Sequence, residues 1–355
     1  MTMCHTTFNS SYLFYCITMI NVISEDVNPA RQNLNRKPIY DYIKVIAIFF
    51  VLCYHCKTAL DISGRSSIAC LINDMVFKMG VPLFFFVSGA LMLCKERKIE
   101  YFLRKEAKIL FLILFWATCS TICCMFYVNK IHIGGGLVDI QEVINRVWHL
   151  SLYYCNYMWF LCTLFALYSI TPFFSCYLKG GRKNILYTLF FATLFSSLTA
   201  LTWKLNPIKN GAVCASSLLY YIMGFLIFKT DIIKLKIRYA FFIIPATICF
   251  YLIYLFYGNE KLGNSYQSIF GVAYISCIVF LMRFINLKAN NIIEFIGKRT
   301  LAIYVLQGPI YKAFDRYLPQ IHEIGIIYPV IVLCTCLGIT YVFEKNKITK
   351  FIISI

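Results

Sequence analysis

Residues 40 to 55, YDYIKVIAIFFVLCYH, indicate the class of fold. This stretch is almost entirely apolar, and residues 41 to 60 supply the about 20 residues that a helix needs to cross a bilayer. Similar stretches recur along the 355-residue chain, which is 60% hydrophobic and only 14% charged, whereas a globular domain carries about 25% charge. The sequence therefore predicts an all-α, polytopic membrane helix bundle.

About ten segments are predicted to span the membrane. The predicted spans are residues 41–60, 75–94, 109–128, 155–176, 185–203, 212–230, 238–257, 267–287, 300–318 and 325–343. The ninth is the least apolar, because Lys312, Asp315 and Arg316 crowd its end. Its outer half is therefore predicted to be interfacial.

The basic residues predict how the bundle is oriented. Of the 34 Lys and Arg residues, 23 fall on one side of the predicted spans, ten on the other, and Lys44 inside the first span. Because cytoplasmic loops are enriched in Lys and Arg, both termini are predicted to be cytoplasmic. The same spread argues against nucleic acid as a partner, since the net charge of +18 never gathers into one basic domain.

The first 36 residues are treated as an N-terminal extension, and residues 37–355 as one membrane domain. The apolar stretch 10–23 has about 14 residues, too few for a span, and it lacks the basic residues and cleavage site of a signal peptide. Two interpretations stay open: an interfacial helix, or sequence upstream of the true start codon. No function is assigned to it.

No metal site is predicted. Cys53 and Cys56 flank His55 in a C-x-x-C pattern, but a zinc site wants about four ligands and no second pair stands at a suitable spacing. Most of the 17 cysteines fall within spans, where cysteine acts as a small apolar residue. The three glycines 134–136 lack the Lys-Ser/Thr of a phosphate-binding loop, so they are interpreted as a connector.

Polar groups within the first span are the strongest functional candidates, because such groups are costly inside a membrane. Lys44 and His55 are eleven residues apart, which on a helix is about 20° beyond three turns and a rise of about 16 Å. They therefore share one face, with Lys44 near the cytoplasm and His55 toward the outside. This pair suits an extended substrate with a cytoplasmic anionic part. The alternative is that Lys44 snorkels to the interface and His55 is interfacial.

Five motifs resemble those of the acyltransferase-3 family of membrane acyltransferases, in the family's order and over residues 37 to about 344. They are Asp41-x-x-Lys44-x-x-Ala47 followed by Val51 and His55; Gly80 to Met92, with its Ser88-Gly89-x-x-Met92 ending; the cytoplasmic stretch Tyr101 to Lys108; Met158-Trp159-Phe160-Leu161 with Tyr168 and Pro172; and Ile296-Gly297-x-x-Thr300-Leu301-x-Ile303-Tyr304.

Two features of the sequence depart from the family pattern. The family's Arg-x-x-Arg pair is here Lys105 and Lys108, which keep the charge but lose the bidentate geometry that suits phosphate; Arg104 is a candidate to supply it. In the predicted ninth span, Gln307 stands where the family often has a histidine. The sequence therefore offers no second histidine at this position.

The resemblance implies transfer of an acyl group, most often acetyl, from acyl-CoA to a hydroxyl of a cell-envelope glycan, its lipid-linked precursor or a small metabolite. Acyl-CoA is then the donor substrate, and no bound cofactor is expected. Its phosphates would meet Lys44, Arg104, Lys105 and Lys108, while its pantetheine arm reaches toward His55. The implied location is a bacterial cytoplasmic membrane, in contact with lipid.

In this interpretation His55 is the general base that removes the proton of the acceptor hydroxyl, and Asp41 and Lys44 fix the donor. An acyl-histidine intermediate is the alternative mechanism. Ser88 is a second nucleophile candidate, although a Ser-Gly pair more often permits close helix packing. Two other functions stay open: a carrier of a lipid-linked glycan, whose transport path Lys44 and His55 would line, and an inactive family member with a binding role.

Overall fold

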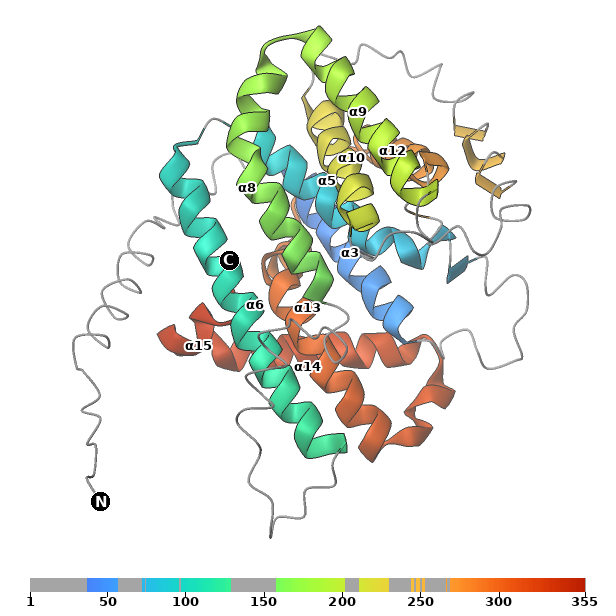
Figure 1. Ribbon diagram of the computed structural model, residues 1–355. Coiled ribbons are helices and arrows are strands. Elements are labelled where there is room, and N and C mark those ends of the chain that lie inside the picture. Colours follow the sequence, from blue (N-terminus) through green and yellow to red (C-terminus); the bar gives the residue numbers. More distant parts are fainter. Residues whose placement is uncertain are drawn as a thin grey trace, which may run out of the picture. The chain divides into compact units, whose positions relative to one another are not determined.

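Figure 1 shows the computed structural model of the protein. It describes residues 37–56, 72–73, 75–95, 97–128, 158–201, 211–229, 244–245, 247–249, 251–252, 266 and 269–354. The chain from Pro38 to Ile355 forms one compact unit. The predictions for the extension 1–36 and for most of the seventh span, 238–257, lie outside the described residues.

The described chain is helical throughout, which confirms the predicted all-α class. Its longer helices are α3 (Pro38–His55), α5 (Gly80–Leu93), α6 (Ile99–Val128), α8 (Trp159–Lys179), α9 (Arg182–Leu201), α10 (Gly211–Phe228), α12 (Ile269–Met282), α13 (Asn291–Tyr317) and α14 (Ile327–Phe343). The shorter ones are η3 (Phe77–Met79), η7 (Pro319–Ile324) and α15 (Lys347–Phe351). No strand occurs among the described residues.

In the part of the chain that the structure describes, two helices, α3 and α8, are long and apolar enough to cross a membrane. Four described segments, Phe77–Leu93, Ser216–Phe228, Ile269–Met282 and Ile327–Phe343, are apolar but shorter than a full span. The helix α13 is long but carries charges at both ends, as the sequence of the ninth predicted span indicates. The count of ten spans and the cytoplasmic placement of the termini stay predictions.

Local sequence explains where several helices begin and end. Helix α3 opens with Pro38, whose fixed φ suits the first helical position, and has Asp41 in its first turn. The Asn290 side chain caps α13 by accepting hydrogen bonds from the amides of Ile292 and Ile293. Between α8 and α9 the backbone of Gly181 has a φ of 119°, which only glycine adopts without strain.

Helix α5 lies at the centre of the packing and is buried on most of its surface. Its most extensive contact is with α10, and it also packs against α3 and α8 (Figure 1). The crossing with α10 is close because both helices have a glycine there. A Cβ on Gly89 would overlap the carbonyl of Tyr221, and a Cβ on Gly224 would overlap the carbonyl of Phe86. The Ser88-Gly89 pair therefore belongs to a helix crossing, as its sequence suggests.

Several helix ends that the sequence predicts on the cytoplasmic side meet one another. The contacts are the hydroxyl of Tyr42 donating to the carbonyl of Lys288 at 3.3 Å, Arg283 donating to the carbonyl of Ile227 at 2.5 Å, and Arg299 pairing with Glu344 at 2.5 Å. They join the start of α3, the ends of α10, α12 and α14, and the start of α13. The starts of α3 and α13 therefore lie near the ends of α10, α12 and α14.

Candidate active site

Helix α3 carries the three site residues predicted in the first span. It is uninterrupted from Pro38 to His55, so Lys44 and His55 share one face and lie about 16 Å apart along the axis. Lys44 is half-buried, and His55 is exposed at the last residue of the helix. The structure thus places the ammonium and the imidazole at opposite ends of one helix, with His55 open to the surface.

Asp41 is buried, with 4% of its surface exposed, where α3 crosses α13. Its side chain lies directly against Gly297: a Cβ at that glycine would come within 2.8 Å of Asp41 Oδ1. The family motif around Gly297 therefore packs against the motif around Asp41. This contact fixes the start of α3 and, with it, the position of Lys44 one turn onward.

Two basic residues of the predicted cytoplasmic stretch lie on α6, where Lys105 is close enough to Lys44 for their charges to interact and Lys108 is close to Lys105. Burial, followed by the positive charges of Arg97 and Lys44, lowers the pKa of the Lys105 ammonium to about 8. Burial and the charge of Lys105 likewise lower the pKa of Lys108 to about 8. We refer to Lys44, Arg97, Lys105 and Lys108 as the basic cluster. Like charges held together in a partly buried place are typical of a site for an anion, although cytoplasmic loops of membrane proteins are basic in any case.

Aromatic rings hold the cluster in place. The guanidinium of Arg97 lies 4.0 Å from the centroid of Tyr101, and Lys105 Nζ lies 5.9 Å from the same ring. Lys108 Nζ lies 3.8 Å from the ring of Phe351 in α15. Cation–π contacts keep a cation positioned without neutralising its charge, so these side chains keep their charge for a ligand.

The guanidinium in the basic cluster comes from Arg97 and not from Arg104. Arg104, predicted to supply a guanidinium to the site, is exposed on another face of α6 from Lys105. Arg97, for which the sequence predicts no role, joins the cluster from the segment before α6. The sequence holds no periodic signal for this placement, because Arg97 precedes α6, which begins at Ile99.

Ser88 faces a group of hydroxyls between α5 and α8. Its hydroxyl is hydrogen-bonded to that of Tyr168, which lies near Tyr101 and Arg97. Beside them, the hydroxyls of Thr171 and Tyr221 are 2.8 Å apart. A phenol ionises only near pH 10, so Tyr168 is a poor base for activating Ser88. The arrangement favours a supporting function for Ser88 over nucleophilic attack.

Tyrosines surround His55 at the other end of α3. Its ring centroid lies 5.6 Å from that of Tyr54 and 6.4 Å from that of Tyr311. The Tyr311 hydroxyl donates to the carbonyl of Leu52 at 2.8 Å, and its ring meets Tyr328 edge to face. Helix α13 therefore braces the end of α3 where His55 is exposed.

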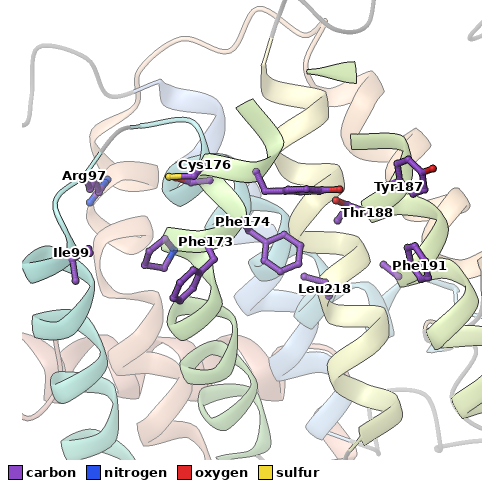
Figure 2. Close-up of a pocket in the computed structure, with 13 residues that line it drawn as sticks. Arg97, Ile99, Phe173, Phe174, Cys176, Tyr187, Thr188, Phe191 and Leu218 are labelled. Carbon is purple, nitrogen blue, oxygen red and sulfur yellow. The ribbon is translucent and has the colours of Figure 1, made fainter. Parts of the chain in front are cut away.

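A cavity of about 1130 Å³ lies between α8, α9 and α10, with the segment before α6 at one edge. Figure 2 shows Phe173 and Phe174 on α8, Tyr187 and Phe191 on α9, Leu218 on α10, and Arg97 at the margin. The lining is almost wholly apolar and includes neither Lys44 nor His55. This cavity adjoins the basic cluster through Arg97 but lacks the groups that acyl transfer requires.

The described residues contain no group of three or more His, Cys, Asp or Glu side chains that could hold a metal ion. Cys53 and Cys56 are both buried near the end of α3, while His55 is exposed. The neighbouring histidine and cysteines therefore do not converge on one point.

Comparison with known proteins defines the class. The family model described as "Acyltransferase domain", that of the acyltransferase-3 family, matches residues 38–345. The chain therefore belongs to the acyltransferase-3 family of membrane proteins, and it is an acyltransferase. Neither the curated proteins nor the solved structures compared with the chain gave a match.

Proposed function

We propose that the protein transfers an acyl group, in the first place acetyl, from cytoplasmic acyl-CoA to a hydroxyl of a cell-envelope glycan or its lipid-linked precursor. In this proposal it is a multi-pass protein of the cytoplasmic membrane, with both termini in the cytoplasm. One observation carries the proposal: a single uninterrupted helix has the basic cluster near its start and His55 at its end.

The basic cluster supports acyl-CoA as the donor. CoA carries several phosphate charges, and charge-assisted hydrogen bonds from Lys and Arg are the strong contacts for phosphate. Lys44, Lys105 and Arg97 are close enough for their charges to interact, so a bound anion would relieve their mutual repulsion. The pantetheine arm then has to extend about 16 Å, the rise of α3 from Lys44 to His55, to bring the thioester to the imidazole.

His55 is the proposed general base. Its imidazole takes the proton from the acceptor hydroxyl, the oxygen attacks the thioester carbonyl carbon, and the carbon–sulfur bond breaks. The CoA thiolate leaves and takes the proton back from the imidazolium, so the enzyme returns to its starting state. The exposure of His55 at the helix end leaves it open to an acceptor that arrives from outside.

The test compares surface glycans of a deletion strain with those of strains that express the wild type or H55Q, by mass spectrometry. We expect acyl groups on the glycan only with the wild type, while the unmodified glycan still reaches the surface in the other strains. Glycan stranded inside the cell would instead indicate a carrier. An unchanged acylation pattern in the deletion strain would contradict the proposal.

The two transfer mechanisms are separable with the purified protein. An acyl-histidine intermediate predicts isotope exchange between acyl-CoA and CoA in the absence of acceptor. Direct transfer, which we favour, predicts no such exchange.

A further inference from the structure

Gln307 is buried inside the bundle without a partner for its amide. Only 1% of its surface is exposed, and among the described residues neither Nε2 nor Oε1 makes a hydrogen bond. A buried polar group without a hydrogen-bond partner destabilises the folded protein. Such a group needs an explanation, and a ligand that supplies the missing partners is one.

The position of Gln307 along α13 places it between the two ends of the proposed site. Helices α3 and α13 run in the same direction, because Gly297 lies against Asp41 and, further along both, Tyr311 bonds to Leu52. Gln307 lies about 15 Å beyond Gly297 and about 6 Å before Tyr311. Along the common direction of α3 and α13, Gln307 therefore lies between the basic cluster and His55.

The neighbours of Gln307 along α13 are buried apolar and aromatic side chains, among them two tyrosines. Tyr304, Gln307 and Tyr311 follow the i, i+3, i+7 spacing that puts side chains on one side of a helix. The ring of Tyr304 lies 5.1 Å from that of Phe160 in α8, and the ring of Tyr311 lies 6.4 Å from that of His55. Gln307 is therefore a polar side chain flanked by buried apolar and aromatic ones.

We infer that Gln307 binds the pantetheine arm of the donor by pairing its amide with an amide of that arm. Nε2 donates to the carbonyl oxygen of the ligand, and Oε1 accepts from its N–H, so both unsatisfied atoms gain a partner. The inference rests on the proposed function. It assigns Gln307 to the donor, because the acceptor approaches from the exposed end of α3 and Gln307 lies on the inner side of that end.

The experiment measures acetyl-CoA binding and transfer in the wild type, Q307M and Q307L. Methionine has nearly the length of glutamine and no amide. We expect the dissociation constant and the donor KM for acetyl-CoA to rise about tenfold. The inhibition constant of 3′-phosphoadenosine 5′-diphosphate should stay unchanged, since this nucleotide half of CoA has no pantetheine arm.

Thr340→Val is the matched control. Thr340 is as deeply buried, but its hydroxyl already donates to the carbonyl of Cys336 at 2.7 Å, and it lies on α14. This variant should keep the wild-type constants for both ligands.

The outcomes separate this inference from the proposed function. Failure of the wild type to bind acetyl-CoA would contradict both the proposed function and the assignment of Gln307. If the wild type binds acetyl-CoA and Q307M binds it equally well, only the assignment of Gln307 is wrong. A rise in acceptor KM with an unchanged donor KM also overturns the assignment. So does failure of both Q307M and Q307L to fold where T340V folds, because Gln307 would then be structural.

Discussion

Asp41 and Gly297 are in direct contact, although 255 residues of sequence separate them, and the contact leaves no room for a side chain on the glycine. Asp41 is buried on α3 one turn before Lys44, and Gly297 opens the motif on α13. The two family motifs furthest apart in the chain thus form one helix crossing.

Gly297→Ala tests this crossing. The new methyl group would meet Asp41 Oδ1 at 2.8 Å and Asp41 Cβ at 2.9 Å, so α3 and α13 would have to separate, at a cost of about 1–3 kcal/mol. We expect a lower melting temperature of the purified protein and a reduced transfer rate, because Lys44 moves with α3.

Gly338→Ala is the control for that substitution. A Cβ at Gly338 in α14 meets nothing within 4 Å, and replacing an exposed helical glycine by alanine stabilises by about 0.5–1 kcal/mol. Equal melting temperatures for the two variants would show that the contact between Asp41 and Gly297 is not tight.

Ser88 and Gly89 are adjacent residues, but the structure predicts that an alanine substitution is tolerated at Ser88 and disrupts folding at Gly89. Ser88→Ala removes one hydrogen bond to Tyr168, worth about 1 kcal/mol, and we expect transfer to fall by less than about tenfold. Gly89→Ala places a methyl group on the carbonyl of Tyr221, and we expect little folded protein. Both are measured by size-exclusion yield and initial rate. A loss of transfer of about a thousandfold in well-folded S88A would restore Ser88 as a nucleophile.

The basic cluster predicts how donor binding depends on pH. Lys105 and Lys108 have pKa values lowered to about 8, chiefly by burial, so both lose their positive charge as the pH rises through 8. The donor phosphates keep their charge over that range. We therefore expect the KM for acyl-CoA to rise between pH 7 and pH 9, by about tenfold for each ammonium that contacts phosphate.

Arginine substitutions test whether deprotonation of Lys105 and Lys108 causes the rise of the donor KM with pH. Arginine stays charged throughout this range, so K105R/K108R should flatten the pH dependence of the donor KM. Lys98→Ala serves as the control, because Lys98 is exposed in the same segment and should leave the profile unchanged. If the double variant keeps the wild-type pH profile, neither lysine meets the phosphates.

The relative placement of site residues on one helix was predictable from the sequence. The placement of residues that different helices bring together was not. The spacing of Lys44 and His55 holds because α3 is unbroken, and periodicity needs no knowledge of neighbours. The inward turn of Lys105 and the exposure of Arg104 depend on which face of α6 packs, and α6 is apolar over much of its length. The contribution of Arg97 depends on the path of the segment before α6, for which the sequence has no periodic signal.

His55→Gln is the variant that tests the chemistry most directly. Glutamine keeps hydrogen-bonding groups but has no titratable nitrogen, and loss of a general base lowers kcat by about 10²–10⁴-fold. Because His55 lies at the far end of α3 from the basic cluster, the dissociation constant of acyl-CoA should change little, so the loss should appear in kcat. His132→Gln, in the predicted external loop, is the control and should keep full activity. A variant at His55 that lost donor affinity in step with its rate would assign the imidazole to donor binding, and the base would then have to be sought elsewhere.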